Sequence, residues 1–276
     1  RRASAPDSMS GRGRRFTIIF TAVAIALTVG RWGSVFLTER LWEASLSGAV
    51  AQAGSRRALF GLLLESLGIV IAAGWCVLHL TIAARAALPD QAPPGSEAAR
   101  LWPSRYPRWW LTVAAVALGV IAGSGVGGWL DEVLLLVDGI RFGVPDPLLG
   151  VDLGVFLRDF PLWLHLQSWA ALLAAVALFG VILIQMAGGA IRIVERRVWV
   201  SADVRGHLAV LLAALALALA WGSALVPFRL AAGMRGPMLS AEFLLRTMVA
   251  QIEAGLGAAA AVMSFLWWLR VRGVAA

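Results

Sequence analysis

Three histidines are the residues of this 276-residue sequence that best suit cofactor binding. His79 and His207 both lie near the expected cytoplasmic ends of apolar stretches, and His165 lies near an outer end. Paired histidines on neighbouring helices can ligate a haem or a chlorin through their ring nitrogens. The same residues also suit hydrogen-bonded packing between helices or a place at the membrane interface. These alternatives stay open, and the sequence itself requires no cofactor.

Carboxylates in one expected outer loop suggest a second kind of chemistry. Asp146 and Asp152 are its candidate metal ligands, because hard cations such as Ca²⁺ bind several carboxylate oxygens. The acidic residues of the loop lack the spacing of an EF-hand. Aspartate before proline, as in Asp146–Pro147, is also typical of a turn in which the carboxylate accepts backbone N–H groups. We therefore prefer a turn-capping role to a metal site.

Two charged residues fall inside apolar stretches at similar expected depths near the outer leaflet. Arg31 and Glu65 form an intramembrane ion pair if their helices face one another, and pairing would lower the cost of burying both charges. Alternatively, each side chain reaches water by itself, Arg31 by extending along the helix to the membrane surface.

Motifs of common enzyme classes are missing. The sequence contains no GxSxG, HExxH or P-loop pattern, and it contains no lysine for a Schiff base. A single cysteine, Cys76, excludes an internal disulfide and a CxxC metal site. We therefore predict a protein that is not an enzyme.

The elements that must position these residues are apolar helices, since 60% of the residues are hydrophobic. A membrane-spanning helix needs about 20 predominantly apolar residues. Six stretches qualify, near residues 16–37, 58–84, 109–130, 162–187, 207–228 and 253–269. They predict an all-α, polytopic integral membrane protein with six transmembrane helices and an interfacial or re-entrant outer loop. A disordered, Arg-rich tail is expected at 1–15 and a short cytoplasmic tail at 271–276.

The arginines predict the orientation of these helices. Most of them fall in segments that lie on one side if the N-terminus is cytoplasmic, as the positive-inside rule requires. Both termini are therefore expected to be cytoplasmic. The net charge of +8 is spread over four such segments, which suits contact with anionic lipid headgroups and not a nucleic-acid surface.

The third stretch carries small residues at helical spacing, namely Ala115, Gly119, Gly123 and Gly127. Such a stripe lets two helix backbones approach closely in a bilayer. We expect it to pack against another helix, either of this chain or of a partner subunit.

The stretch RFGVPDPLLGVDLGVFLRDFP, residues 141–161, cannot be one continuous helix because of its prolines, and its glycines permit turns. It predicts a compact outer cap, with the fourth helix beginning after Pro161. Its order resembles the pattern FGxxDPxFxxDxxFYxFxLP of the large bacterial and cyanobacterial membrane proteins of uncharacterised protein family 0182. The matching cap residues are Phe142, Gly143, Asp146, Pro147, Asp152 and Pro161. Departures occur at Leu148 or Leu149, at Val155 and Phe156, and at Arg158.

The resemblance implies a bacterial inner-membrane protein of a family without an established biochemical role. Family members typically continue into a further span and a large extracytoplasmic domain, which this sequence does not include. We expect a non-catalytic structural or accessory subunit of a larger membrane protein complex, in contact with lipids and other membrane subunits. The alternatives are a transporter or channel for a lipid or small solute that uses the Arg31 and Glu65 region, and a haem- or chlorin-binding membrane subunit.

Overall fold

The computed structural model describes residues 26, 29–38, 40–42, 45, 49–86, 109–139, 141–194, 197–233 and 239–273. The chain divides into two compact units, Arg1–Leu63 and Leu64–Ala276. In the first unit, residues 29–38 and 40–42 are helical, and the Arg40 guanidinium lies 5.6 Å from the ring centroid of Phe36. The predicted tail at 1–15, most of the first predicted span at 16–37 and the last residues of the tail at 271–276 lie outside the described residues.

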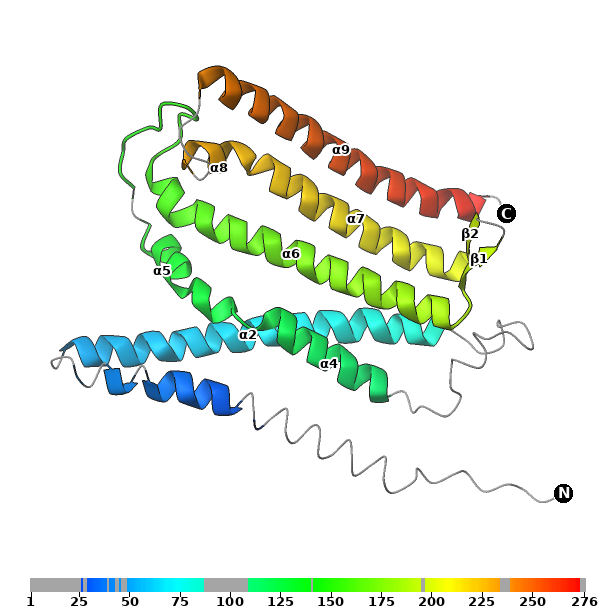
Figure 1. Ribbon diagram of the computed structural model, residues 1–276, viewed down its shortest axis with the longest axis horizontal. Coiled ribbons are helices and arrows are strands. Elements are labelled where there is room, and N and C mark those ends of the chain that lie inside the picture. Colours follow the sequence, from blue (N-terminus) through cyan, green and yellow to red (C-terminus); the bar gives the residue numbers. More distant parts are fainter. Residues whose placement is uncertain are drawn as a thin grey trace. The chain divides into compact units, whose positions relative to one another are not determined.

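The second unit is built almost entirely from helices, which confirms the all-α class (Figure 1). Helix α2 (Ala49–Ala86) enters this unit at Leu64. The remaining helices are α4 (Trp109–Gly123), the 3-10 helix η2 (Val126–Trp129), α5 (Leu130–Asp138), α6 (Gly154–Ala187), α7 (Ala202–Ala224), α8 (Val226–Ala231) and α9 (Ser240–Gly273). A two-stranded antiparallel hairpin, β1 (Ile191–Val194) and β2 (Arg197–Val200), joins α6 to α7.

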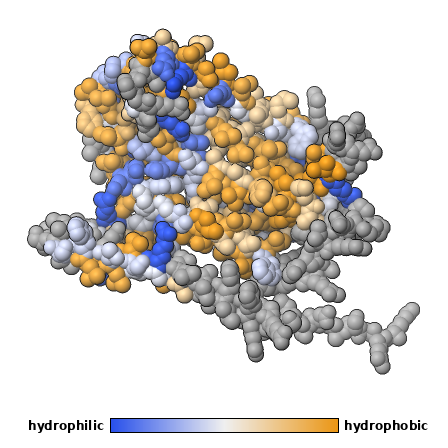
Figure 2. All heavy atoms as spheres, viewed as in Figure 1, coloured by the Kyte–Doolittle hydropathy of each residue, from blue (hydrophilic) through white to orange (hydrophobic). Residues whose placement is uncertain are grey.

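Helices α6, α7 and α9 lie side by side with α7 in the middle (Figure 1). The main core forms where the second half of α2 meets α6 and α7, and its fully buried members include Cys76, Val181 and Leu211. Apolar residues also cover most of the middle of the bundle in the view of Figure 2. Five helical segments among the described residues are long and apolar enough to cross a membrane: Arg56–Ala86, Trp110–Val137, Gly154–Ala187, Val204–Ala231 and Ser240–Leu269.

The third predicted span is not the continuous helix expected for residues 109–130. Helix α4 ends at Gly123, Gly125 has a φ of 104°, and the chain continues as η2 before α5 begins. A positive φ of this size suits glycine, and a run of glycines lowers helix propensity. The third apolar segment is therefore a broken helix.

Two further helix starts differ from the predicted ones. Helix α6 begins at Gly154 and contains Pro161, which was expected to precede it. Pro161 offers no N–H to the carbonyl of Leu157, a residue whose side chain is exposed. Helix α9 begins at Ser240, well before the predicted start at residue 253. The cap is therefore shorter than expected, and α9 is longer.

Candidate functional site

Two of the three histidines form a partly buried pair between α2 and α7. His79 Nδ1 lies 2.8 Å from His207 Nε2, and their rings stack with centroids 5.1 Å apart. The ring of Trp75 lies 4.2 Å from that of His79, and the Trp75 indole donates a hydrogen bond to the Leu173 carbonyl of α6. The pair is thus held at the meeting point of three helices.

This spacing bears on haem ligation. Two metal–imidazole bonds of about 2 Å each would place the ligating nitrogens about 4 Å apart. At 2.8 Å the imidazoles instead share a hydrogen bond, in which one ring donates and the other accepts. His79 Nε2 is buried without a partner among the described residues. The pair as it stands is a polar contact between helices and not a preformed axial ligand set.

His165 lies apart from this pair. Its Nε2 is 3.6 Å from Glu132 Oε1, and its ring stacks on Trp129 with centroids 5.3 Å apart. Trp129 in turn contacts Trp169, whose indole donates a hydrogen bond to the Ala122 carbonyl. His165 therefore joins a contact between α5 and α6.

Glu65 binds the broken part of the third span. Both of its carboxylate oxygens accept the Gly125 N–H, at 3.0 and 2.9 Å, and Oε2 also accepts the Gly127 N–H at 2.8 Å. These are backbone donors that the interrupted helix leaves free. Arg31 lies in the first unit, so the predicted ion pair between Arg31 and Glu65 stays a prediction.

The small-residue stripe lies against α2 of the same chain. A Cβ atom added to Gly119 would lie 2.1 Å from the Ala73 Cα, and one added to Gly123 would lie 2.5 Å from the Ile69 Cα. Ala115 is fully buried. Gly127 falls in η2, where its N–H is bound by Glu65. Gly119 and Gly123 thus permit a backbone approach within one chain.

The cap at residues 141–153 is a small closed loop. The Asp146 N–H donates to the Val151 carbonyl at 2.7 Å, and the Leu153 N–H donates to the Val144 carbonyl at 2.9 Å. Gly143 and Gly150 have φ near +68°, where glycine is favoured. Of the other matching cap residues, Phe142 is exposed and Pro147 lies in the turn that follows Asp146.

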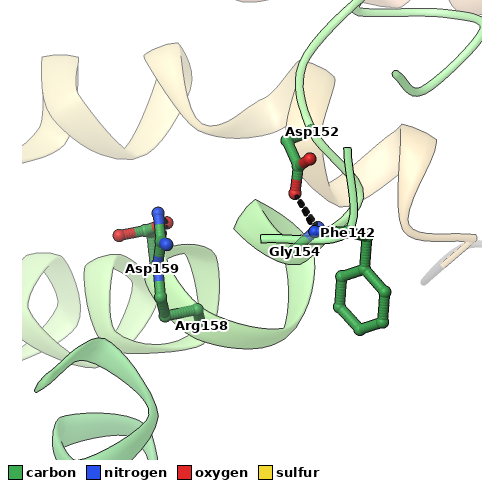
Figure 3. Close-up of polar contacts among 5 residues, drawn as sticks. All are labelled: Phe142, Asp152, Gly154, Arg158 and Asp159. Carbon is green, nitrogen blue, oxygen red and sulfur yellow. Dashed lines mark hydrogen bonds and ion pairs between the residues drawn. The ribbon is translucent and has the colours of Figure 1, made fainter. Parts of the chain in front are cut away.

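Both aspartates of the cap hold backbone N–H groups. Asp146 is buried, and its Oδ1 accepts the N–H groups of Leu148 and Leu149 at 3.1 and 2.9 Å. The Asp152 carboxylate faces the backbone of Phe142 and Gly154 (Figure 3). Its Oδ1 accepts these two N–H groups at 3.2 and 2.7 Å.

The second oxygen of Asp152 and its neighbours complete the network of the cap. Oδ2 accepts the Gly143 N–H at 2.6 Å. Partial desolvation favours the neutral carboxyl, but the three backbone hydrogen bonds and the nearby Arg158 outweigh it and lower the pKa of Asp152. Arg158 itself contacts Asp159 at 2.6 Å (Figure 3). Within the described ranges, no group of three or more His, Cys, Asp and Glu residues could hold a metal ion.

Several polar contacts between helices were not singled out from the sequence. Gln167 of α6 donates to the Ala218 carbonyl of α7 at 3.0 Å, and Gln185 of α6 donates to the Ala83 carbonyl of α2 at 3.0 Å. Both glutamines are buried. Isolated amides within long apolar runs were the available signal, because a buried amide requires partners. Their partners are backbone carbonyls, which no sequence pattern marks.

Long apolar helices joined by buried polar contacts define an all-α protein in which five described segments are long and apolar enough to cross a membrane. It belongs to the uncharacterised protein family UPF0182, whose family model matches residues 16–274. The family resemblance of the cap sequence is thereby confirmed. No solved structure matches the chain.

Relatives named UPF0182 protein occur in several bacteria. The Salinispora tropica protein is 29% identical over 221 residues, covering 78% of this chain and 22% of that protein. The Pelobacter propionicus protein is 32% identical over 228 residues, covering 78% of this chain and 24% of that protein. The Geobacter sulfurreducens protein is 35% identical over 119 residues, covering 43% of this chain and 13% of that protein. The chain thus spans about a quarter or less of the length of these relatives.

Proposed function

We propose that the chain is a non-catalytic membrane domain that acts as a structural or accessory part of a larger membrane assembly, in which α9 docks another membrane segment. The proposal places it in the bacterial inner membrane with both termini cytoplasmic, in contact with lipids and other membrane subunits and not with nucleic acid. Its main support is the exposed surface of α9, which carries an acidic residue within an apolar stretch.

Helix α9 is the least covered of the five membrane-length segments. In the apolar 18-residue stretch of α9, 11% of the residues are buried, against 22–39% in the corresponding stretches of the other four segments. Its large exposed apolar residues include Leu244, Leu245, Met248, Val249, Ile252, Leu256, Val262 and Met263. Lipid tails can cover such a surface, so exposure alone does not require a protein partner.

Glu253 supplies the argument for a partner. It lies 13 residues after Ser240 and 16 before Leu269, so about 20 Å and 24 Å of helix separate it from these ends. Wherever a hydrocarbon core of about 30 Å falls within this span, an upright α9 places Glu253 at least about 6 Å inside the core. Glu253 is exposed, and among the described residues its one hydrogen bond comes from Ser223 of α7 at 3.3 Å.

A carboxyl group within hydrocarbon is stabilised by hydrogen-bond donors from another helix, which lipid tails cannot supply. Ser223 provides one donor, and the rest of the carboxyl group faces outward from the α7–α9 pair. We infer that a neighbouring helix with a polar or basic side chain packs over Glu253. That helix belongs either to a separate subunit or to another part of a longer polypeptide.

The test compares Glu253→Gln with Glu242→Gln in protein extracted from its own membrane with mild detergent. Glu242 is a matched control, because it lies on the same helix in an exposed ion pair with Arg246 at 2.6 Å. An interhelical hydrogen bond in a membrane contributes about 0.6 kcal/mol, so Glu253→Gln is expected to lower recovery of a defined partner about threefold. Unchanged recovery, or a monodisperse monomer that never recovers a partner, would contradict the proposal.

A second candidate function, transport of a lipid or small solute, is favoured by the broken third span. Transporters often build their sites from interrupted helices whose free backbone groups face a polar side chain. Here Glu65 faces the N–H groups of Gly125 and Gly127. Liposomes containing the chain would be assayed for flux of a fluorescent phospholipid and of protons. Transport by the wild type that Glu65→Gln abolishes without loss of assembly would favour this candidate, and equal flux in protein-free liposomes would reject it.

A further inference from the structure

Arg229 of α8 is a charged residue whose partners within the chain do not balance it. Its Nη2 donates a long hydrogen bond of 3.5 Å to Gln167 Oε1, and its Nε is buried with no partner in the part of the chain that the structure describes. Nη1 has no hydrogen-bond partner within the described ranges, and it is not among the buried atoms that lack one. Across the described residues, no carboxylate forms an ion pair with Arg229.

The position of this guanidinium is fixed by its neighbours. Gln167 is buried, and its amide nitrogen donates to the Ala218 carbonyl at 3.0 Å, which orients its oxygen as an acceptor. A Cβ atom added to Gly222 would lie 2.8 Å from Gln167 Nε2, so α7 closes over this amide. Helix α8 is held to α6 by aromatic contacts of Phe228 with Phe160 and Trp163, at 5.8 and 5.7 Å between centroids.

A guanidinium is always charged and carries five N–H donors in a planar fork. One long hydrogen bond to a neutral amide therefore leaves most of the donors of Arg229, and its whole charge, without a counterpart. Burying such a charge in an apolar bundle is costly unless an anion accompanies it. Arg229 is half-buried, with Nε enclosed, so an anion is the counterpart that suits it best, and the terminal nitrogens are the side of the group that an anion can reach.

We propose that Arg229 binds a phosphate oxyanion through the fork of Nη1 and Nη2, with Gln167 holding the guanidinium in place. Planar, two-pronged donors match phosphate oxygens, and arginine is the residue most suited to this geometry. In a membrane protein, phosphate is available from phospholipid headgroups as well as from solution. Exposed apolar residues occur on both α6 and α7, for example Leu157 and Leu219.

The test measures binding of phosphatidylglycerol to the delipidated chain in detergent by native mass spectrometry. Diacylglycerol, which has the same acyl chains and no phosphate, is the ligand control. Arg246→Gln is the variant control, because the Arg246 side chain is 40% exposed and already paired with Glu242. The wild type and Arg246→Gln are expected to bind phosphatidylglycerol alike, and neither should bind diacylglycerol saturably.

Arg229→Gln is expected to weaken phosphatidylglycerol binding about tenfold, which corresponds to the loss of one charge-assisted contact. Arg229→Lys keeps the charge without the fork and is expected to weaken binding about threefold. Wild-type affinity in Arg229→Gln, or saturable binding of diacylglycerol, would overturn the proposal. If Arg229→Gln does not elute as a folded species, Arg229→Lys decides, and wild-type affinity in that variant would overturn recognition by the fork.

A competition with inorganic phosphate identifies the source of the oxyanion. Displacement of phosphatidylglycerol by millimolar phosphate would support a site that also accepts the free ion. Retention of the lipid under the same conditions would support a site for the phospholipid headgroup. Both outcomes are consistent with an oxyanion site, which only the Arg229 variants and the diacylglycerol control can refute.

Discussion

Glu65 is expected to contribute more to the free energy of unfolding than any exposed carboxylate of the bundle. Replacing it with alanine would leave the N–H groups of Gly125 and Gly127 without their acceptor. A hydrogen bond to a charged group contributes about 1.5–3 kcal/mol. Glu65 is only half-buried, so the low end applies, and the two bonds together give about 3 kcal/mol. Glu65→Gln keeps one acceptor oxygen and should lose about half of this amount.

The assay is equilibrium unfolding in mixed micelles of mild detergent and SDS, followed by far-UV circular dichroism. Glu242→Gln serves as the control, since an exposed pair at helical i,i+4 spacing contributes at most about 0.5 kcal/mol. The expected order of stability is wild type, Glu242→Gln, Glu65→Gln and then Glu65→Ala. If Glu65→Ala unfolds together with Glu242→Gln, the carboxylate does not hold the broken span, and the reasoning is refuted.

Two other predictions concern the contact of α4 with α2, and the cap. Gly119→Ala should destabilise the fold by about 1–3 kcal/mol, because its Cβ would lie 2.1 Å from the Ala73 Cα. Gly74→Ala is the control: it has open space around it and should be neutral or slightly stabilising in the same unfolding assay. The pKa of Asp152 is lower in the folded cap than in an unfolded chain. Its contribution to the stability of the folded cap is therefore complete above the ordinary carboxyl pKa of about 3.9, and it is lost as the pH falls through the lower folded value. Hydrogen exchange at Gly143 and Gly154, corrected for intrinsic rates, should therefore rise only under strongly acidic conditions, and Asp152→Asn should raise it at neutral pH; protection that is equal in both proteins at neutral pH would contradict this.

The helical class could be predicted from the sequence because it depends on composition alone, and long apolar runs have few other folds in a membrane. The capping role preferred for Asp146 agrees with its hydrogen bonds to Leu148 and Leu149, since an aspartate before proline acts through its immediate neighbours. The same local reasoning was wrong about Pro161. A proline eight residues into a helix depends on how the surrounding turn is placed, and the sequence pattern does not contain that information.

Contacts between helices were beyond sequence reasoning. His79 and His207 are 128 residues apart in the sequence. Whether they meet depends on how α2 and α7 are rotated about their axes, and one sequence does not determine that rotation. The break at Gly125 could have been suspected from the run of glycines, but the stripe of Gly119, Gly123 and Gly127 suited one helix equally well. Gly123→Leu would test the docking of a partner subunit if the stripe faced one. Because Gly123 lies against α2, this substitution is expected to disturb the approach of α4 to α2.

The distance along α6 between its two buried glutamines has a consequence for how the bundle fits a bilayer. Gln167 and Gln185 are separated by about 18 residues, or roughly 27 Å of helix, which is close to the thickness of a hydrocarbon core. Each amide ties α6 to a neighbouring helix near one end of this interval. Because α6 is joined to α7 at one level and to α2 at the other, these helices cannot easily slide past one another to match a thicker or thinner bilayer. Adaptation to bilayer thickness should therefore occur by tilting of the bundle as a whole or by deformation of the surrounding lipid.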